Sequence, residues 1–307
     1  MMANFQEITS GLRFPEGPIA LPNGNVLLVE IEAGRLTQVE PSGTQTIIAN
    51  LAGGPNGAAI GPDGRCYICN NGGIPFFQKG DLILPGLSKS NTPHGWIEAV
   101  DLKTGMAETL YQSCNERPLI GPNDIVFDAV GGFWFTDHGH TRRNDRDRGG
   151  VFYATIDGSS IKEVLAPLDG PNGIGISPDG SELYVAETLT GRIWAFEIGN
   201  PGEIVRTNGP VPWQKGRLVA SPEGYHLFDS LAVDNDGSIC VGSIPGAIDI
   251  FSPNGLHLNS ISLPDTFPTN ICFGGPKLDV AFITLSSTGK LISMEWPSGG
   301  LPLNFLN

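Results

Sequence analysis

The stretch GPNGIGISPDG (residues 170–180), followed by ELYVAE (182–187), decides the fold of this chain. Two short apolar runs flank a Pro-Asp-Gly corner, and Asp-Gly between apolar runs is a strong sequence signal for a β-hairpin. A third apolar run, GRIWAF (191–196), begins after another glycine. The segment therefore predicts three consecutive antiparallel strands.

The same pattern recurs along the whole chain. Its copies are FPEGPIALPNG (14–24), GPNGAAIGPDG (54–64), GPNDIVFDAVG (121–131), GPNGIGISPDG (170–180), FDSLAVDNDG (228–237) and the degenerate PTNICFGGP (268–276). Six units in 307 residues average about 51 residues each, the size of a four-stranded blade. We therefore expect an all-β, six-bladed β-propeller formed by one domain over residues 1–307. We expect a strand at residues 4–8 to complete the last blade.

Composition limits the classes of partner. The chain carries 18 Lys and Arg against 32 Asp and Glu, a net charge of −14, which disfavours binding to nucleic acids or anionic membranes. It contains neither a basic start with an apolar run typical of secretory signals nor a stretch of 18 apolar residues. We expect a cytoplasmic protein, either a monomer or a small homo-oligomer.

Aligning the copies on their turns places one residue of each at the start of the first strand. These residues are Glu16, Asn56, Asn123, Asn172, Asp229 and Thr269. The first strand of each propeller blade lines the central channel, so the six positions would surround the axis at one end. Asn is also a common turn residue, which would explain any single Asn without a ligand. Glu is not, and a set of oxygen donors with two carboxylates predicts one divalent ion in the channel, Ca²⁺ in preference to Mg²⁺, Mn²⁺ or Zn²⁺.

The second strands end in another polar group. Its members are Glu30, Asn70, Asp137, Glu187 and Ser243. Outer partners of this kind often orient metal ligands, and we assign this role to Glu30, Asp137 and Glu187. The alternative is that strand ends are polar because they meet water.

The motifs FPEGP (14–18), GPND (121–124) with FTD (135–137), PNGI (171–174) with SPDG (177–180), and the late Asp229 occur in order. In this order they resemble the senescence-marker-protein (regucalcin)/gluconolactonase family. The resemblance implies a six-bladed propeller that hydrolyses lactones with a divalent ion. It also implies that Glu16, Asn172 and Asp229 are ligands, that Asn123 is a ligand or substrate contact, and that Asp229 is the general base.

The substrate contacts are less well defined by the sequence. Sugar-lactone members of the family often carry an Arg shortly before the Pro-Asn-Asp motif, where this chain has Gly121. Arg117 is the nearest replacement, and we add Asn56, Asn123 and His226 as candidate substrate contacts. A sugar lactone or a small γ- or δ-lactone is therefore the expected substrate.

Two other functions compete with lactone hydrolysis. An organophosphate or ester hydrolase would use the same electrophilic ion, and a non-enzymatic binding propeller would use Ca²⁺ for stability alone. The chain contains no G-x-S-x-G motif, which argues against a serine hydrolase.

Overall fold

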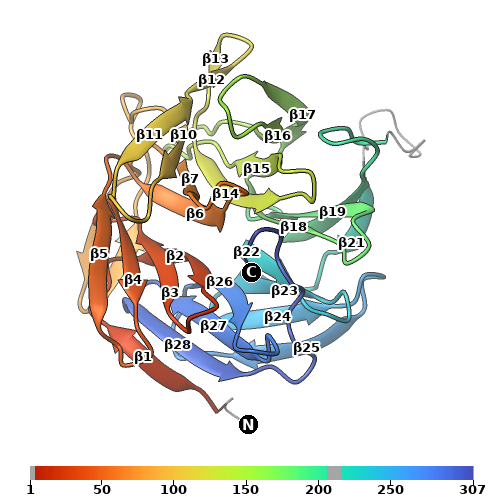
Figure 1. Cartoon of the computed structure of the whole chain (residues 1–307). Coiled ribbons are helices and arrows are strands. Elements are labelled where there is room, and N and C mark those ends of the chain that lie inside the picture. The colour runs from red at the N-terminus through yellow and green to blue at the C-terminus, as the bar shows by residue number, and fades with distance from the viewer. Residues whose placement is uncertain (1–3, 206–215, 307) are drawn as a thin grey trace.

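A computed structural model describes residues 4–205 and 216–306. The described residues form six four-stranded antiparallel sheets arranged as blades around a central axis (Figure 1). The six-bladed β-propeller predicted from the repeat is confirmed. The same residues contain no helix long and apolar enough to cross a membrane.

Each blade has an inner, a second, a third and an outer strand. The inner strands are β2 (Pro15–Ala20), β6 (Pro55–Ile60), β14 (Pro122–Phe127), β18 (Pro171–Ile176), β22 (Leu227–Val233) and β26 (Pro268–Gly274). The second strands are β3 (Val26–Glu30), β7 (Cys66–Asn70), β15 (Phe133–Asp137), β19 (Glu182–Glu187), β23 (Ile239–Ile244) and β27 (Val280–Leu285). The third strands are β4 (Arg35–Val39), β10 (Trp96–Val100), β16 (Gly149–Ala154), β20 (Arg192–Glu197), β24 (Ala247–Phe251) and β28 (Lys290–Glu295). The outer strands are β5 (Gln45–Asn50), β11 (Ala107–Tyr111), β17 (Ile161–Leu168), β21 (Arg217–Ala220), β25 (His257–Ser262) and β1 (Gln6–Ser10).

The inner strands close a ring. Each contacts the inner strand of the blade on either side, and β2 contacts β26 to complete the circle. The hydrophobic core lies between neighbouring blades, as where Tyr67 of β7 packs against Phe127 and Phe133 of the next blade.

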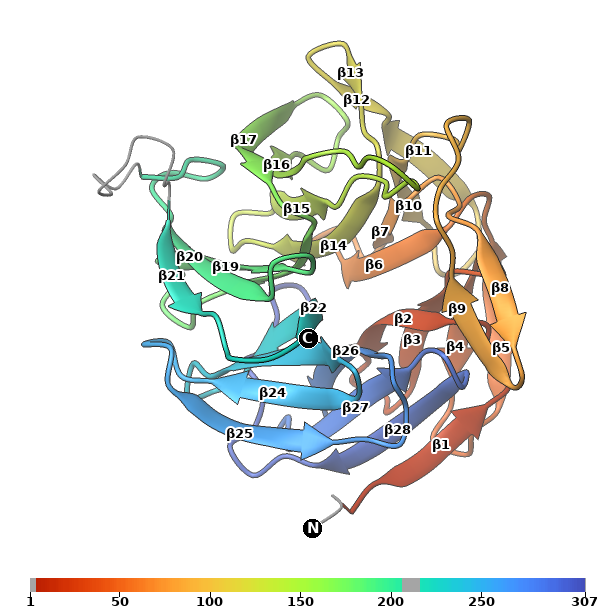
Figure 2. The same cartoon turned by 180° about the vertical axis from the view of Figure 1, so that it is seen from behind.

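The N-terminal strand completes the last blade. β1 pairs antiparallel with β28, and Gln6 lies opposite Ser293. The expected strand at 4–8 therefore exists, although it begins at Gln6 and extends to Ser10. Both views place it at the edge of the ring beside β28 (Figures 1 and 2).

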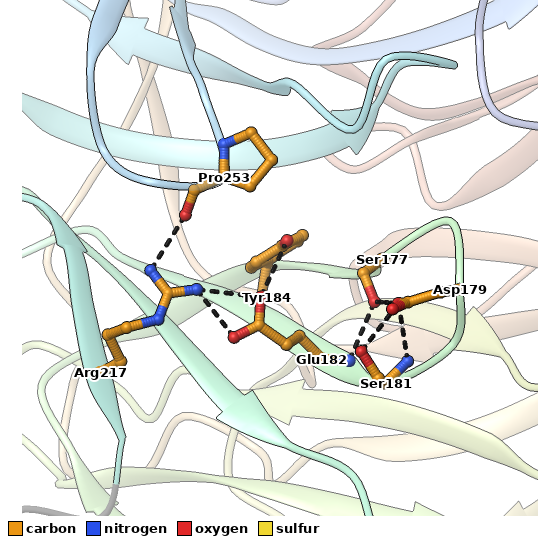
Figure 3. A network of polar contacts seen from close by, with 7 residues as sticks. All are labelled: Ser177, Asp179, Ser181, Glu182, Tyr184, Arg217 and Pro253. Atoms are coloured by element: carbon orange, nitrogen blue, oxygen red, sulfur yellow. Dashed lines mark hydrogen bonds and ion pairs between the residues drawn. The ribbon is translucent and has the colours of Figure 1, made fainter.

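The hairpin turn at the far end of β18 shows how a repeated corner is held (Figure 3). The N–H of Gly180, whose φ is 74°, donates to the carbonyl of Ser177 at 2.9 Å. The Asp179 carboxylate accepts the Ser177 hydroxyl at 2.6 Å and the Ser181 N–H at 3.1 Å. Arg217 of β21 then binds Glu182 and the carbonyl of Pro253 in the next blade.

Every inner strand contains a break in register near its start. The pairing with the second strand shifts between Glu16 and Ile19, Pro55 and Ala58, Pro122 and Ile125, Pro171 and Ile174, Phe228 and Leu231, and Pro268 and Asn270. Such bulges interrupt the strict alternation of side chains between the two faces of a strand. The backbones also approach closely here, because a Cβ on Gly173 would lie 2.6 Å from the N atom of Leu231.

Two hairpins are added to the six blades. They are β8 (Phe76–Lys79) with β9 (Leu82–Pro85), and β12 (Ser113–Cys114) with β13 (Arg117–Pro118). The first packs across blade boundaries, since the Phe76 ring lies 4.9 Å from that of Phe14 and the Ile83 N–H donates to Ser287. The second projects from the periphery of the ring (Figures 1 and 2).

Candidate metal centre

The structure brings the six predicted channel residues to one end of the ring. Each is the second residue of its inner strand, except Asp229, which is the third. Five of them are buried, and Asp229 is partly exposed: Glu16 (2%), Asn56 (7%), Asn123 (8%), Asn172 (5%), Thr269 (1%) and Asp229. The repeat explains this common position, because in every copy except the degenerate sixth the residue stands at the same place relative to the hairpin turn that follows the inner strand.

Hydrogen bonds join these residues across the channel. The Ser230 hydroxyl lies 3.3 Å from Oε1 of Glu16 and 3.4 Å from Oδ1 of Asn172, so one group links three blades. Nδ2 of Asn270 donates to Oε2 of Glu16 at 2.7 Å, and the N–H of Gly17 donates to the same oxygen. Glu16 and Asn172 therefore converge, although 156 positions separate them in sequence.

Three channel residues were missed by sequence reasoning: Asp124, Ser230 and Asn270. Each directly follows a predicted residue, and simple strand alternation would place it on the opposite face. The bulges remove that alternation. A signal was available, because the other three copies have glycine at this position and these three have polar residues.

Burial dominates the electrostatics of the channel. Burial raises the pKa of Glu16 to about 7, and the hydrogen bonds from Asn270 and Gly17 oppose it. Burial also raises the pKa of Asp229 and Asp124, and in both cases the negative charge of Glu16 adds to the shift. Three carboxyl groups that repel one another thus share one desolvated space, which a cation would stabilise.

The raised pKa of Glu16 gives a testable pH dependence for the metal-free protein. Between the unfolded value of 4.5 and about 7, the folded state binds more protons, so stability falls as pH rises through this range. We expect Glu16→Gln to raise the Tm at pH 8 by a few degrees and to leave it little changed at pH 5. Melting curves in chelator at both pH values measure this.

Glu223→Gln is the matched control, because Glu223 is exposed and lies outside the channel. It should leave the pH profile unchanged. A Glu16→Gln protein that melts at or below the wild-type temperature at pH 8 contradicts the argument.

The donor atoms fit a hard divalent cation. Oδ1 of Asn123 is buried and has no hydrogen-bond partner within residues 4–205 and 216–306, an arrangement that costs free energy unless a ligand binds it. Nδ2 of Asn172 donates to Thr188 at 3.1 Å, which fixes its amide. In the described part of the chain, no three His, Cys, Asp or Glu side chains form a metal cluster by themselves. The set therefore depends on amide oxygens, which suit Ca²⁺ better than Zn²⁺.

The predicted outer residues Glu30, Asp137 and Glu187 contact the backbone just before three of the six channel residues. Glu30 accepts the N–H of Arg13 at 2.8 Å and Glu187 accepts that of Asp169 at 2.8 Å. Asp137 accepts three backbone N–H groups, from Ile120, Gly121 and Gly139. These carboxylates hold the segments that enter β2, β18 and β14. Their predicted role as partners of the ligand amides stays a prediction.

The candidate substrate contacts lie in different places. Asn56 is the second residue of the inner strand β6, the same position that Asn123 has on β14. Arg117 lies on the peripheral hairpin, its side chain is 72% exposed, and it pairs with Glu163 of the outer strand β17 at 3.5 Å. The structure therefore does not bring Arg117 to the channel residues.

His226 directly precedes the inner strand β22, three residues before Asp229. Its Nδ1 is 3.1 Å from the Ser243 hydroxyl and 3.3 Å from the Asp249 carboxylate, and its Nε2 is 3.1 Å from the carbonyl of Glu223. Both ring nitrogens therefore have protein partners.

Comparisons with known proteins agree with this architecture. A gluconolactonase of Zymomonas mobilis is 27% identical, over 91% of this chain and 78% of the relative. A diisopropyl-fluorophosphatase of Loligo vulgaris is also 27% identical, over 96% and 93%. The crystal structure of a calcium-binding regucalcin from Agrobacterium tumefaciens superposes with a TM-score of 0.75 at 18% identity, covering 99% of both chains. The family model described as the SMP-30/gluconolactonase/LRE-like region matches residues 14–287, and the chain therefore belongs to this family.

Proposed function

We propose that this protein is a lactone hydrolase that uses one divalent metal ion in the central channel. Two observations carry the proposal: Glu16, Asn172 and Asp229 converge, and on β14, which contacts β18, the buried Asn123 oxygen has no hydrogen-bond partner among the described residues. The gluconolactonase from Zymomonas mobilis supports the choice of reaction.

Four residues would hold the ion: Glu16, Asn123, Asn172 and Asp229. Two carboxylates match the charge of one divalent cation, and two amide oxygens complete a hard donor set. A bound ion would polarise the lactone carbonyl and stabilise the negative charge that develops on its oxygen. Ca²⁺ is the ion we expect.

Asp229 is the proposed general base. It is partly exposed, whereas Glu16 is buried, so water and substrate reach Asp229 more easily. In the metal-free protein burial raises its pKa, and a bound divalent ion would oppose this shift and keep the carboxylate available as a base. It would take a proton as water adds to the lactone carbonyl carbon. It would then return that proton to the ring oxygen when the C–O bond breaks, leaving a hydroxy acid.

The channel favours an uncharged lactone. Its described residues supply carboxylates, amides and hydroxyl groups, whereas Arg117 lies on the peripheral hairpin. The arginines near position 142 pair with carboxylates of the protein: Arg142 with Asp145 and Asp147 in its own loop, and Arg146 and Arg148 with Asp169. A lactone that carries a carboxylate or phosphate would therefore meet the channel carboxylates with no Lys or Arg side chain among the described channel residues to offset the repulsion.

A substrate panel tests the proposal. We expect the Ca²⁺-loaded protein to hydrolyse neutral γ-, δ- and sugar lactones with a kcat/KM on the order of 10⁴ M⁻¹ s⁻¹ or above for at least one of them, as is usual for enzymes. pH-stat titration of the released acid measures turnover directly. The absence of turnover across the panel with every divalent ion would favour a non-enzymatic binding propeller.

A phosphoric-ester hydrolase is the second candidate. The relative from Loligo vulgaris, a diisopropyl-fluorophosphatase, favours it, and the same donor set would activate a phosphoryl centre. Phosphotriesters and phosphofluoridates therefore belong in the panel. A higher kcat/KM for these than for every lactone would select this second activity.

A further inference from the structure

A large cavity lies in the channel behind the candidate metal centre. Its volume is about 1030 Å³, at the upper end of the range for small-molecule sites. It begins at Gly17, Asp124 and Asn270 and extends to the hairpin turns at the other end of the ring, including Gly180. The described residues that line it do not include the six predicted channel residues, but Asp124 and Asn270, which interact with Glu16, form its inner end, so the cavity adjoins the candidate metal centre.

The wall of the cavity is mostly apolar. All six inner strands contribute aliphatic or aromatic side chains to it. Several of these side chains, although enclosed by the six blades, are not fully buried by the protein: Ile60, Val126, Ile176 and Ala232. When an apolar molecule covers apolar surface that water still reaches inside a fold, the free energy of the system falls.

The C-terminal segment lies across the far end of the cavity. The N–H of Leu301 donates to the carbonyl of Val233 at 3.1 Å, and Nδ2 of Asn304 donates to the carbonyl of Phe127 at 3.0 Å. The segment thereby connects two blades that are not neighbours, and Figure 1 shows the C-terminus near the centre of the ring. Leu303 and Leu306 add apolar surface to the wall. A molecule inside would be enclosed on this side.

The charges around the cavity restrict what it can bind. The described lining residues contain no Lys, Arg or His, and their acidic residues are Asp124, Asp128 and Asp179. Asp179 stands at the rim, where hydrogen bonds from Ser177 and Ser181 hold its pKa at about 2 and keep it ionised (Figure 3). An anionic amphiphile such as a fatty acid would therefore be repelled.

We propose that this cavity is a second binding site, which takes one uncharged apolar small molecule such as a medium-chain alcohol or a hydrocarbon. It adjoins the candidate metal centre but includes none of the four proposed metal ligands, and its occupation does not depend on lactone hydrolysis. Because its inner end is formed by residues that directly follow Glu16, Asn123 and Thr269, a bound molecule would contact the same inner strands as the substrate.

Fluorescence titration with N-phenyl-1-naphthylamine, a neutral apolar probe, tests the site. We expect saturable binding of one probe per chain, displaced by 1-decanol and not by decanoate. Ala232→Phe fills part of the cavity and should weaken binding by roughly tenfold or more. Ala107→Phe, on the exposed outer strand β11, is the matched control and should bind like the wild type.

Each outcome decides the proposal. If Ala232→Phe fails to give a cooperative melting transition, Ala59→Leu on β6 replaces it, since Ala59 also lines the cavity. The proposal is overturned by non-saturable binding, by equal affinities in the Ala232→Phe and Ala107→Phe proteins, or by displacement with decanoate as readily as with decanol. None of these readouts involves catalysis, so a failure here leaves the proposed hydrolase activity to be judged by its own panel.

Discussion

Asp229→Asn should lower kcat for lactone hydrolysis by about 10²–10⁴-fold, the usual contribution of a general base. The amide has nearly the same shape as the carboxylate and keeps an oxygen that can face the ion, but it cannot accept the proton of the attacking water. Burial and the charge of Glu16 both raise the pKa of Asp229, which means that its carboxylate is unfavourable in the metal-free protein. The substitution removes this carboxylate, so the metal-free protein should not lose stability. pH-stat kinetics and a melting curve measure the two effects together.

Asp236→Asn is the control for this substitution. Asp236 lies in the exposed turn at the other end of the same inner strand, and its change should leave kcat and KM as in the wild type. Full activity in the Asp229→Asn protein would show that another group accepts the proton. Loss of activity together with loss of the folded state would require Asp229→Glu as a second variant, which keeps the base but displaces it.

Removing the metal ion should abolish lactone hydrolysis, with a loss on the order of a hundredfold or more, because the carbonyl loses its electrophile. Re-addition of Ca²⁺ should restore it. An ion present at 100 times its Kd also adds about 2.7 kcal/mol to the free energy of unfolding, so chelation should lower the Tm. Activity assays and melting curves in EDTA, before and after Ca²⁺ is restored, measure both effects.

Glu16→Gln separates loss of the ion from side effects of the chelator. It removes one of two carboxylates in the donor set, and isothermal titration calorimetry should show Ca²⁺ affinity reduced by about tenfold or more. Glu223→Gln should bind Ca²⁺ like the wild type. Undiminished hydrolysis in EDTA, with no ion detected in the protein, would contradict metal dependence.

The repeat predicted the architecture because turn chemistry recurs at the same offset in every unit. Five of the six inner hairpins are closed by the same hydrogen bond, from a glycine N–H to the carbonyl three residues earlier, at Gly24, Gly64, Gly131, Gly180 and Gly237. Such local turn signals can be recognised in the sequence. Aligning the copies on these turns predicts the positions of Glu16 and Asp229 near the start of their inner strands.

The rest of the site depends on long-range packing that a repeat does not encode. Ser230 and Asn270 enter the channel because of a break in strand register, and bulges have no simple residue signature outside glycine. Arg117 is predicted as a substrate contact because it is close to Asn123 in sequence. In the structure it pairs with Cys114 in the short peripheral hairpin of β12 and β13. Sequence distance near a loop is therefore a poor measure of distance to the channel.

Closure of the ring by β1 and β28 would also set when the candidate metal centre is completed during synthesis. Glu16 belongs to the first blade to leave the ribosome, whereas Asn270, which binds it, belongs to the last. Bringing these ends together costs the entropy of closing a loop of 254 residues, a cost that nearest-neighbour blade contacts must offset beforehand. A growing chain with five blades would hold Glu16 without the hydrogen bond from Asn270. Calcium affinity in such truncated chains therefore reports whether the circle of blades has been completed.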